Sequence, residues 1–168
     1  LGSVHRLYLR ECTGITDVSM LGHVHTIDLS YCYAITDVSA LGNVHTLDLR
    51  TCRSVTNVSA LCDVHTLKIS FFQHAVDVSP LHKVHSLRLD DCIAITNTDI
   101  SALRNVHTLH LENCPQITNV STLGSVHSLT VSYCNGVSDV SALGSVHSLH
   151  FKWCNGVSDV SALGSVHS

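Results

Sequence analysis

The most constraining feature of this chain is a pattern that returns about every twenty residues. Each copy opens with Leu-x-x-Val-His, as in "LGNVHTLDL" at 41–49. The full copies cover residues 1–20, 21–40, 41–60, 61–80, 81–102, 103–122, 123–142 and 143–162, and a partial ninth copy covers 163–168. Such a period is typical of a solenoid, in which each repeat packs only against its neighbours. We therefore predict a single repeat domain over 1–168.

Apolar residues occupy fixed positions within each copy, counted from its opening Leu. Positions 1, 4, 7, 9, 12, 15 and 18 are nearly always apolar or Cys. Positions 7 and 9 alternate with variable residues at 8 and 10, which predicts a short strand with one buried face. Twenty residues leave no room for a full α-helix, so the return segment "ITDVSALG" is expected to be extended or a single 3-10 turn. The insertion from Asn97 to Ala102 is expected to bulge on the convex side.

The pattern V-x-x-L-x-L-x-x-C-x-x-I resembles the leucine-rich repeat along the whole chain. Segments such as "ITDVSALGNV" are similar to internalin-type repeats, and Cys at position 12 is similar to the cysteine-containing subclass. Tandem "LGNVHTLDL" units also resemble repeat arrays of giant DNA viruses of amoebae. The resemblance implies a curved leucine-rich-repeat solenoid, with parallel β-strands on the concave face and little or no α-helix on the convex face. It also implies protein binding without catalysis.

Composition and motifs disfavour several functional classes. The net charge is −4, and the nine Lys and Arg residues do not cluster along the sequence, which disfavours a nucleic-acid or anionic-membrane partner. No apolar run approaches the roughly 18 residues that a membrane span needs. G-x-S-x-G, Walker and H-E-x-x-H motifs do not occur in the sequence. We therefore expect a non-enzymatic chain without a cofactor.

Histidine occupies position 5 of every copy. The column comprises His5, His25, His45, His65, His85, His107, His127, His147 and His167. We expect these residues at the corner that leads into each strand, where neutral imidazoles bond the backbone or one another. A metal column and a pH sensor are alternatives. Nine identical residues define no particular site, so no metal site is predicted, and stability is expected to fall as the pH drops through about 6.

Cysteine forms a second column at position 12, interrupted by Phe72. It comprises Cys12, Cys32, Cys52, Cys92, Cys114, Cys134 and Cys154, while Cys62 lies off the column. A disulfide between adjacent coils would join groups that the strand ladder already holds in register. We expect buried thiols that donate weakly to backbone carbonyls. A zinc or redox role is the alternative, although no C-x-x-C pair occurs. Free thiols favour a reducing, cytoplasmic location.

Two polar columns occupy the return segment. Asp or Asn stands at position 17 and Ser at position 19, as in Asp37 and Ser39. Such side chains bond nearby backbone groups in turns, which is the role we expect here. A calcium-binding carboxylate column is the alternative, although Asn replaces Asp in three copies.

Function in a solenoid is expected where the copies differ. Positions 8 and 10 should point outward from the strands, with position 11 at their edge. Aromatic and Arg residues there are typical of protein-binding hot spots. The candidate binding residues are Tyr8, Asp28, Tyr31, Asp48, Lys68, Phe71, Arg88, His110, Tyr133, His150 and Trp153. The hypothesis is a protein-interaction module whose partner the sequence does not name. The alternative is a structural or self-assembling scaffold, including a homodimer through the terminal coil with Phe151 and Trp153.

Overall fold

The described part of the chain forms one sheet of eight parallel strands in sequence order. The computed structural model describes residues 4–71, 76–164 and 166. The strands are β1 (Arg6–Tyr8), β2 (Thr26–Asp28), β3 (Thr46–Arg50), β4 (Thr66–Ser70), β5 (Ser86–Asp90), β6 (Thr108–Glu112), β7 (Ser128–Ser132) and β8 (Ser148–Lys152). Equal repeat positions pair across every step, for example Leu47 with Leu67 and Leu67 with Leu87. The twenty-residue period therefore sets the register directly.

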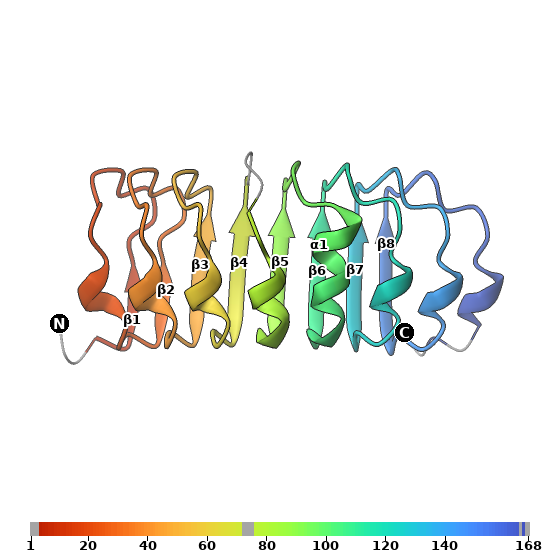
Figure 1. The fold of residues 1–168 in the computed structure, drawn as a ribbon, viewed down its shortest axis with the longest axis horizontal. Helices are drawn as coiled ribbons and strands as arrows, with labels where there is room; N and C mark the ends of the chain where they lie inside the picture. The colour runs from red at the N-terminus through yellow and green to blue at the C-terminus, as the bar shows by residue number, and fades with distance from the viewer. Residues whose placement is uncertain (1–3, 72–75, 165, 167–168) are drawn as a thin grey trace.

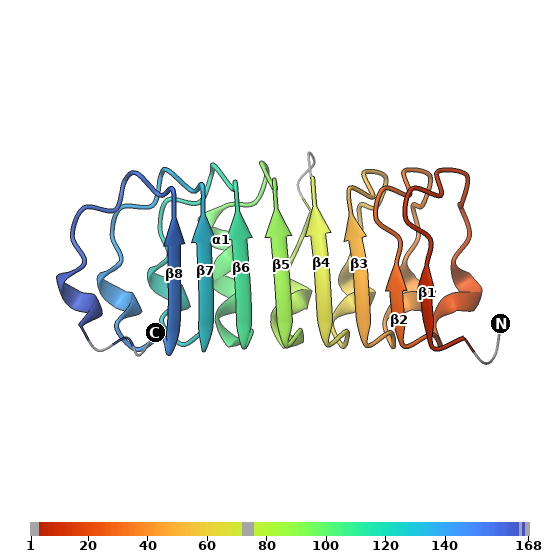
Figure 2. The same ribbon diagram turned by 180° about the vertical axis from the view of Figure 1, so that it is seen from behind.

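Short 3-10 turns form a second layer that covers one face of the sheet (Figure 1). They are η1 (Ser19–Leu21), η2 (Ser39–Leu41), η3 (Ser59–Leu61), η4 (Ser79–Lys83), η5 (Ala102–Asn105), η6 (Ser121–Leu123), η7 (Ser141–Leu143) and η8 (Ser161–Leu163). Seen from behind, the strands stand in front and their outer face carries no further layer of secondary structure (Figure 2). The fold is thus a solenoid, as the sequence predicts.

The copy at 81–102 is two residues longer than the others, and the extra length is accommodated on the turn side, as expected. It produces the helix α1 (Asn97–Ser101), while β5 and β6 keep the common register of Ser86 with Thr108. The Thr96 N–H donates to Asp99 Oδ2 at 2.7 Å, which caps the helix. Asn97 leaves the usual turn role and its Oδ1 accepts the Thr118 N–H of the next coil at 2.9 Å. The insertion therefore changes the convex layer and leaves the sheet intact.

The apolar columns meet between the two layers and form one continuous core. In the third coil, Val44, Leu47 and Leu49 are buried to within a few percent of full burial. Position 17 supplies the expected turn bonds, because the Ser39 N–H donates to Asp37 Oδ1 at 2.8 Å. Equivalent bonds occur at Ser19, Ser59, Ser79, Ser121, Ser141 and Ser161. These columns thus act as backbone partners of a coil that has little helix.

Position 11 adopts a conformation that the sequence pattern does not reveal. All eight residues there have positive φ, between 50° and 64°: Glu11, Tyr31, Thr51, Phe71, Asp91, Asn113, Tyr133 and Trp153. Only Asp and Asn among these are common in the left-handed region. At six of these positions the N–H still extends the strand ladder; for example, the Tyr31 N–H donates to Arg50 O at 2.8 Å. The left-handed residue therefore turns the chain at the end of each strand.

Candidate protein-interaction face

The outer surface of β1–β8 carries positions 8 and 10, and we call it the strand face. Its position-8 side chains are more exposed at the two ends than in the centre. Tyr8 is 65% exposed at one end, and His150 is exposed at the other. Lys68, Arg88 and His110 are half-buried in the middle. Asp48 is only 7% exposed. Position 8 thus lies on this face throughout, but its central members are engaged with their neighbours.

Two of the candidate binding residues are acids whose carboxylates are occupied within the sheet. Asp48 accepts two hydrogen bonds from Arg50 Nε, at 2.9 and 3.1 Å, and one from Arg50 NH2 at 2.7 Å. Lys68 Nζ lies 3.9 Å from the same carboxylate across the strand. Asp28 accepts the Ser30 hydroxyl at 2.6 Å. Asp48 therefore orients Arg50 and lies near Lys68, whereas Asp28 is engaged with Ser30.

A second charged cluster spans β5 and β6. The Arg88 guanidinium donates to Asp90 Oδ2 at 2.6 Å and to Glu112 Oε2 at 2.7 Å. His110 Nε2 lies 3.1 Å from Glu112 Oε2 and 3.9 Å from Asp90 Oδ1. Burial raises the pKa of Asp90, and the Arg88 hydrogen bond opposes that rise. The cluster is thus a network that holds four side chains in fixed positions.

The same cluster offers the donor set of a divalent-cation site. Asp90, His110 and Glu112 each present one possible ligand atom, and these atoms lie within 4.8 Å of one another. Asp90 Oδ1 is buried and accepts no hydrogen bond. However, the positive Arg88 already holds Asp90 Oδ2 and Glu112 Oε2, so a cation would have to displace it or meet its charge. The ion-pair network is the arrangement that the geometry favours.

Position 10 is more buried than its outward direction suggests. Ser30, Ser70, Ser132 and Asp90 are each less than 9% exposed. Their groups serve the sheet: the Ser70 hydroxyl accepts the Thr51 N–H at 3.0 Å. At these four residues, position 10 is covered by neighbouring groups and offers little exposed surface to a partner.

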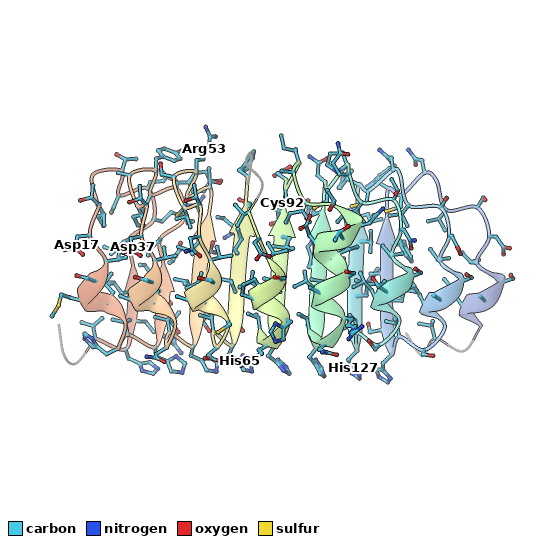
Figure 3. All side chains as sticks on the ribbon, in the orientation of Figure 1. Asp17, Asp37, Arg53, His65, Cys92 and His127 are labelled. Carbon is cyan, nitrogen blue, oxygen red and sulfur yellow. The ribbon has the colours of Figure 1, made fainter. Side chains whose placement is uncertain are left out.

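Aromatic and Arg side chains form a row where the strands end. The Arg10 guanidinium lies 5.1 Å from the Tyr31 ring centroid, and Tyr31 meets Tyr33 edge-on with centroids 6.5 Å apart. Arg53 lies between two rings, 5.5 Å from Tyr33 and 5.6 Å from Phe71. Figure 3 places Arg53 at this edge. We call these residues, with Tyr133 and Trp153, the aromatic edge.

Sequence reasoning missed Tyr33 and Arg53, which stand at position 13. The signal was present, because position 13 varies between copies as strongly as position 8 does. At the far end of the edge, Tyr133 and Trp153 stack with centroids 6.3 Å apart, and they are 43% and 61% exposed. The candidates Tyr31 and Phe71 are half-buried. The edge therefore carries two aromatic groups, one at each half of the solenoid.

A shallow hollow joins the strand face to the second aromatic group. Its volume is about 250 Å³, and its lining comprises His110, Glu112, Thr130, Ser132, Tyr133, His150 and Lys152. Three of the candidate residues thus meet here. The lining combines imidazole, carboxylate, ammonium and phenol groups, which suits a polar or aromatic side chain of a partner.

The position-5 histidines form a stacked row at the opposite corner of the coils. Ring centroids of neighbours from His5 to His147 lie 4.4–4.5 Å apart, and most pairs are near parallel. Figure 3 shows His65 and His127 on this edge, away from Arg53. His167 lies outside the described residues. From His5 to His127 the described rings stack and no hydrogen bond joins two of them, which corrects part of our expectation. Four of them instead lie within hydrogen-bond distance of the hydroxyl of the following Thr.

Backbone and side-chain bonds hold this histidine row in place. The carbonyl of each described ladder His from His5 to His127 accepts the N–H that begins the next strand, for example Thr66 N to His45 O at 2.9 Å. His45 Nδ1 lies 3.2 Å from Thr46 Oγ1, and the tautomer decides which atom donates. Close neighbours lower the pKa of His25, His65 and His107: partial desolvation acts first, and repulsion between adjacent imidazoles adds to it.

Five of the seven column cysteines are buried as the sequence predicts, whereas Cys12 in the first coil is exposed and Cys154 in the eighth is half-buried. All eight are free, and Cys32, Cys52, Cys92, Cys114 and Cys134 are buried. The Cys52 thiol donates to Leu29 O at 3.1 Å, and Cys32 donates to Leu9 O at the same distance. Burial raises the pKa of Cys52 to about 12. Phe72, which interrupts the column, lies outside the described residues. The column is thus a set of corner-filling thiols.

Thiol labelling is expected to separate buried from accessible cysteines. Cys12 is exposed and Cys62 is half-buried, whereas the Cys52 thiolate is strongly disfavoured by burial. In the folded protein at about pH 8, a small alkylating reagent should therefore modify Cys12 and Cys62 first. Peptide mass spectrometry would count the sites, with urea-unfolded protein as the control in which all eight react. Labelling of Cys52 as fast as Cys12 would contradict this assignment.

The solved structures that resemble this solenoid include three internalin-type proteins. An internalin (inlF) from Listeria monocytogenes matches with a TM-score of 0.66 and 20% identity, over 95% of this chain and 51% of that one. Internalin C2 from the same species matches with a TM-score of 0.64 and 24% identity, over 93% and 76%. The functional domain of InlJ, which includes a cysteine ladder, matches with a TM-score of 0.50 and 18% identity, over 95% and 47%.

This chain has the leucine-rich-repeat fold. No family model and no curated protein sequence matches it, so the likeness is one of architecture. The leucine-rich-repeat solenoid spans about half the length of the InlF chain that it resembles. Its own cysteine column parallels the cysteine ladder described for InlJ. No helix among the described residues is long and apolar enough to cross a membrane.

Proposed function

We propose that this solenoid is a non-catalytic module that binds a protein partner through the strand face and the adjoining aromatic edge. The observation that carries the proposal is the aromatic edge itself. Exposed Tyr and Trp rings and an Arg held between two rings line the ends of parallel strands. Aromatic and Arg side chains contribute most of the binding energy at protein interfaces.

Fixed geometry strengthens this proposal. Asp48 holds Arg50, and Asp90 and Glu112 hold Arg88, so these guanidinium groups are ordered before any partner arrives. Ordering in advance reduces the entropy that binding costs. The hollow beside Tyr133 offers a place for one protruding side chain. Together these features support a rigid, mixed-charge surface with aromatic anchors.

The test begins with affinity capture on the whole chain, followed by identification and purification of the captured protein. Titration calorimetry then compares wild type with the double variant Tyr133→Ala/Trp153→Ala. We expect the double variant to bind at least about tenfold more weakly, because each aromatic anchor is worth about 1 kcal/mol or more. Met20→Ala is the matched control, since Met20 is exposed by 73% on the turn side.

Two results would overturn this assignment. Equal affinity of wild type and the double variant would remove the aromatic edge from the interface. Concentration-dependent oligomers that the double variant leaves unchanged, measured by light scattering, would favour the self-assembling scaffold. The internalin-like architecture supports the proposal only at the level of the fold.

We also propose a reducing compartment for this protein. Its support is the set of eight free cysteines, of which Cys12 is exposed. Exposed thiols oxidise readily where the surroundings are oxidising. Fractionation of the native source, followed by immunodetection, would test this location directly.

A further inference from the structure

The structure separates charge in a way that the composition conceals. The chain carries a net charge of −4, yet its acids avoid the corner that holds the stacked histidines. Across positions 1–6 of all nine copies, Asp63 is the only carboxylate, whereas Arg6, Lys83 and Arg104 are cations. We call this corner the histidine edge. It is weakly positive even when every imidazole is neutral.

The ladder rings are placed to face solvent together. All eight from His5 to His147 are exposed, and seven steps of 4.4–4.5 Å give a row about 31 Å long. Both opposite views show this corner at one level from β1 to β8 (Figures 1 and 2). Rings that share one level on a rigid scaffold can reach a flat surface at the same time.

Acidification converts this row into a dense line of positive charge. Within positions 1–6 of the copies, the other charged or titratable groups are Arg6 of β1, His23, Cys62, Asp63, His82 and Lys83 of η4, and Arg104 of η5. Among them only Asp63 opposes the imidazolium charge. Because neighbouring rings repel one another when protonated, the ladder charges stepwise and over a wide pH range. A nearby anionic surface would relieve that repulsion.

We propose that the histidine edge is a pH-gated binding surface for an anionic lipid bilayer. The bilayer is the occupant that the geometry favours, because a bilayer is flat and the corner that carries the ladder rings lies at one level from β1 to β8. Each cation near an anionic leaflet adds a modest attraction, and a rigid row adds these attractions together. The aromatic edge lies on the opposite side of the sheet from the histidine edge, as Arg53 and the pair His65 and His127 show in Figure 3.

The experiment is co-sedimentation of the full chain with vesicles of phosphatidylcholine and phosphatidylserine, at about pH 5 and about pH 7.5. Circular dichroism at both values confirms that the protein is folded. We expect binding at least about tenfold stronger at the lower pH, and its loss in high salt. Vesicles of pure phosphatidylcholine should bind little at either pH.

Histidine variants distinguish the contribution of the ladder imidazoles to vesicle binding from that of imidazoles elsewhere. The quadruple variant His45→Gln/His65→Gln/His85→Gln/His107→Gln should lose most of the acid-induced binding. The matching replacements by Lys should bind at about pH 7.5 as well, because their charge no longer depends on protonation. The double variant His110→Gln/His150→Gln, which removes imidazoles from the strand face, should bind vesicles as wild type does.

Three results would overturn the proposal. The first is equal binding at both pH values by folded wild-type protein. The second is equal binding to vesicles with and without phosphatidylserine. The third is acid-dependent retention on heparin without any vesicle binding, which would assign the edge to a soluble polyanion.

Discussion

Replacing Leu87 by Ala is expected to lower the free energy of unfolding by about 3 kcal/mol. Leu87 is 1% exposed in β5 and pairs with Leu67 on one side and Leu109 on the other. The smaller side chain leaves a cavity that two flanking coils share and that the strand ladder prevents from closing. Urea unfolding followed by circular dichroism would measure the change.

The same substitution at Leu149 is the matched control. Leu149 occupies the same repeat position in β8 but is only partly buried, and its described strand pairing is with Leu129 alone. Its replacement by Ala should therefore cost about 1 kcal/mol, since less apolar surface leaves water there. If both substitutions lowered the free energy of unfolding equally, this would contradict the view that each coil is stabilised by packing against the coils on both sides.

Lowering the pH from about 7.5 to about 5 is expected to destabilise the fold through the histidine row. The pKa values of His25, His65 and His107 lie below the ordinary value of 6.5 in the folded protein. The unfolded chain therefore takes up protons more readily in this window. The contribution of these neutral histidines to stability is fully present above about pH 6.5 and is lost progressively as the pH falls below that value.

Unfolding midpoints across this pH range would measure the effect. The triple variant His25→Gln/His65→Gln/His107→Gln should show a flatter pH profile than wild type between about pH 7.5 and 5. Asp37→Asn is the control: the Ser39 hydrogen bonds lower the pKa of Asp37 below 3.8, so its contribution is lost only at still lower pH. A wild-type midpoint that stays constant over this range would refute the prediction.

Much of the exposed surface of the strands and their ends could be located from sequence, but the contacts among its side chains could not. The variable positions correctly placed Tyr133, Trp153 and His150 on an accessible surface. They did not reveal that Asp48 is held by Arg50, or that Arg88 joins two strands through Asp90 and Glu112. Such pairs connect different repeat positions on neighbouring coils. Their formation depends on side-chain length and rotamer, which the repeat pattern of the sequence does not specify.

The sequence by itself determined the solenoid, the parallel register, and the histidine and cysteine columns. A pattern of apolar residues that returns at nearly constant spacing permits few other folds, because each coil must bury the same side chains against the next. Only the tertiary structure decided the left-handed residue at position 11, the aromatic edge that includes Tyr33 and Arg53, and the stacking of the histidine rings along one exposed edge. The physical reason is that each arises from how the corners of a coil turn, and that geometry decides which columns share a surface.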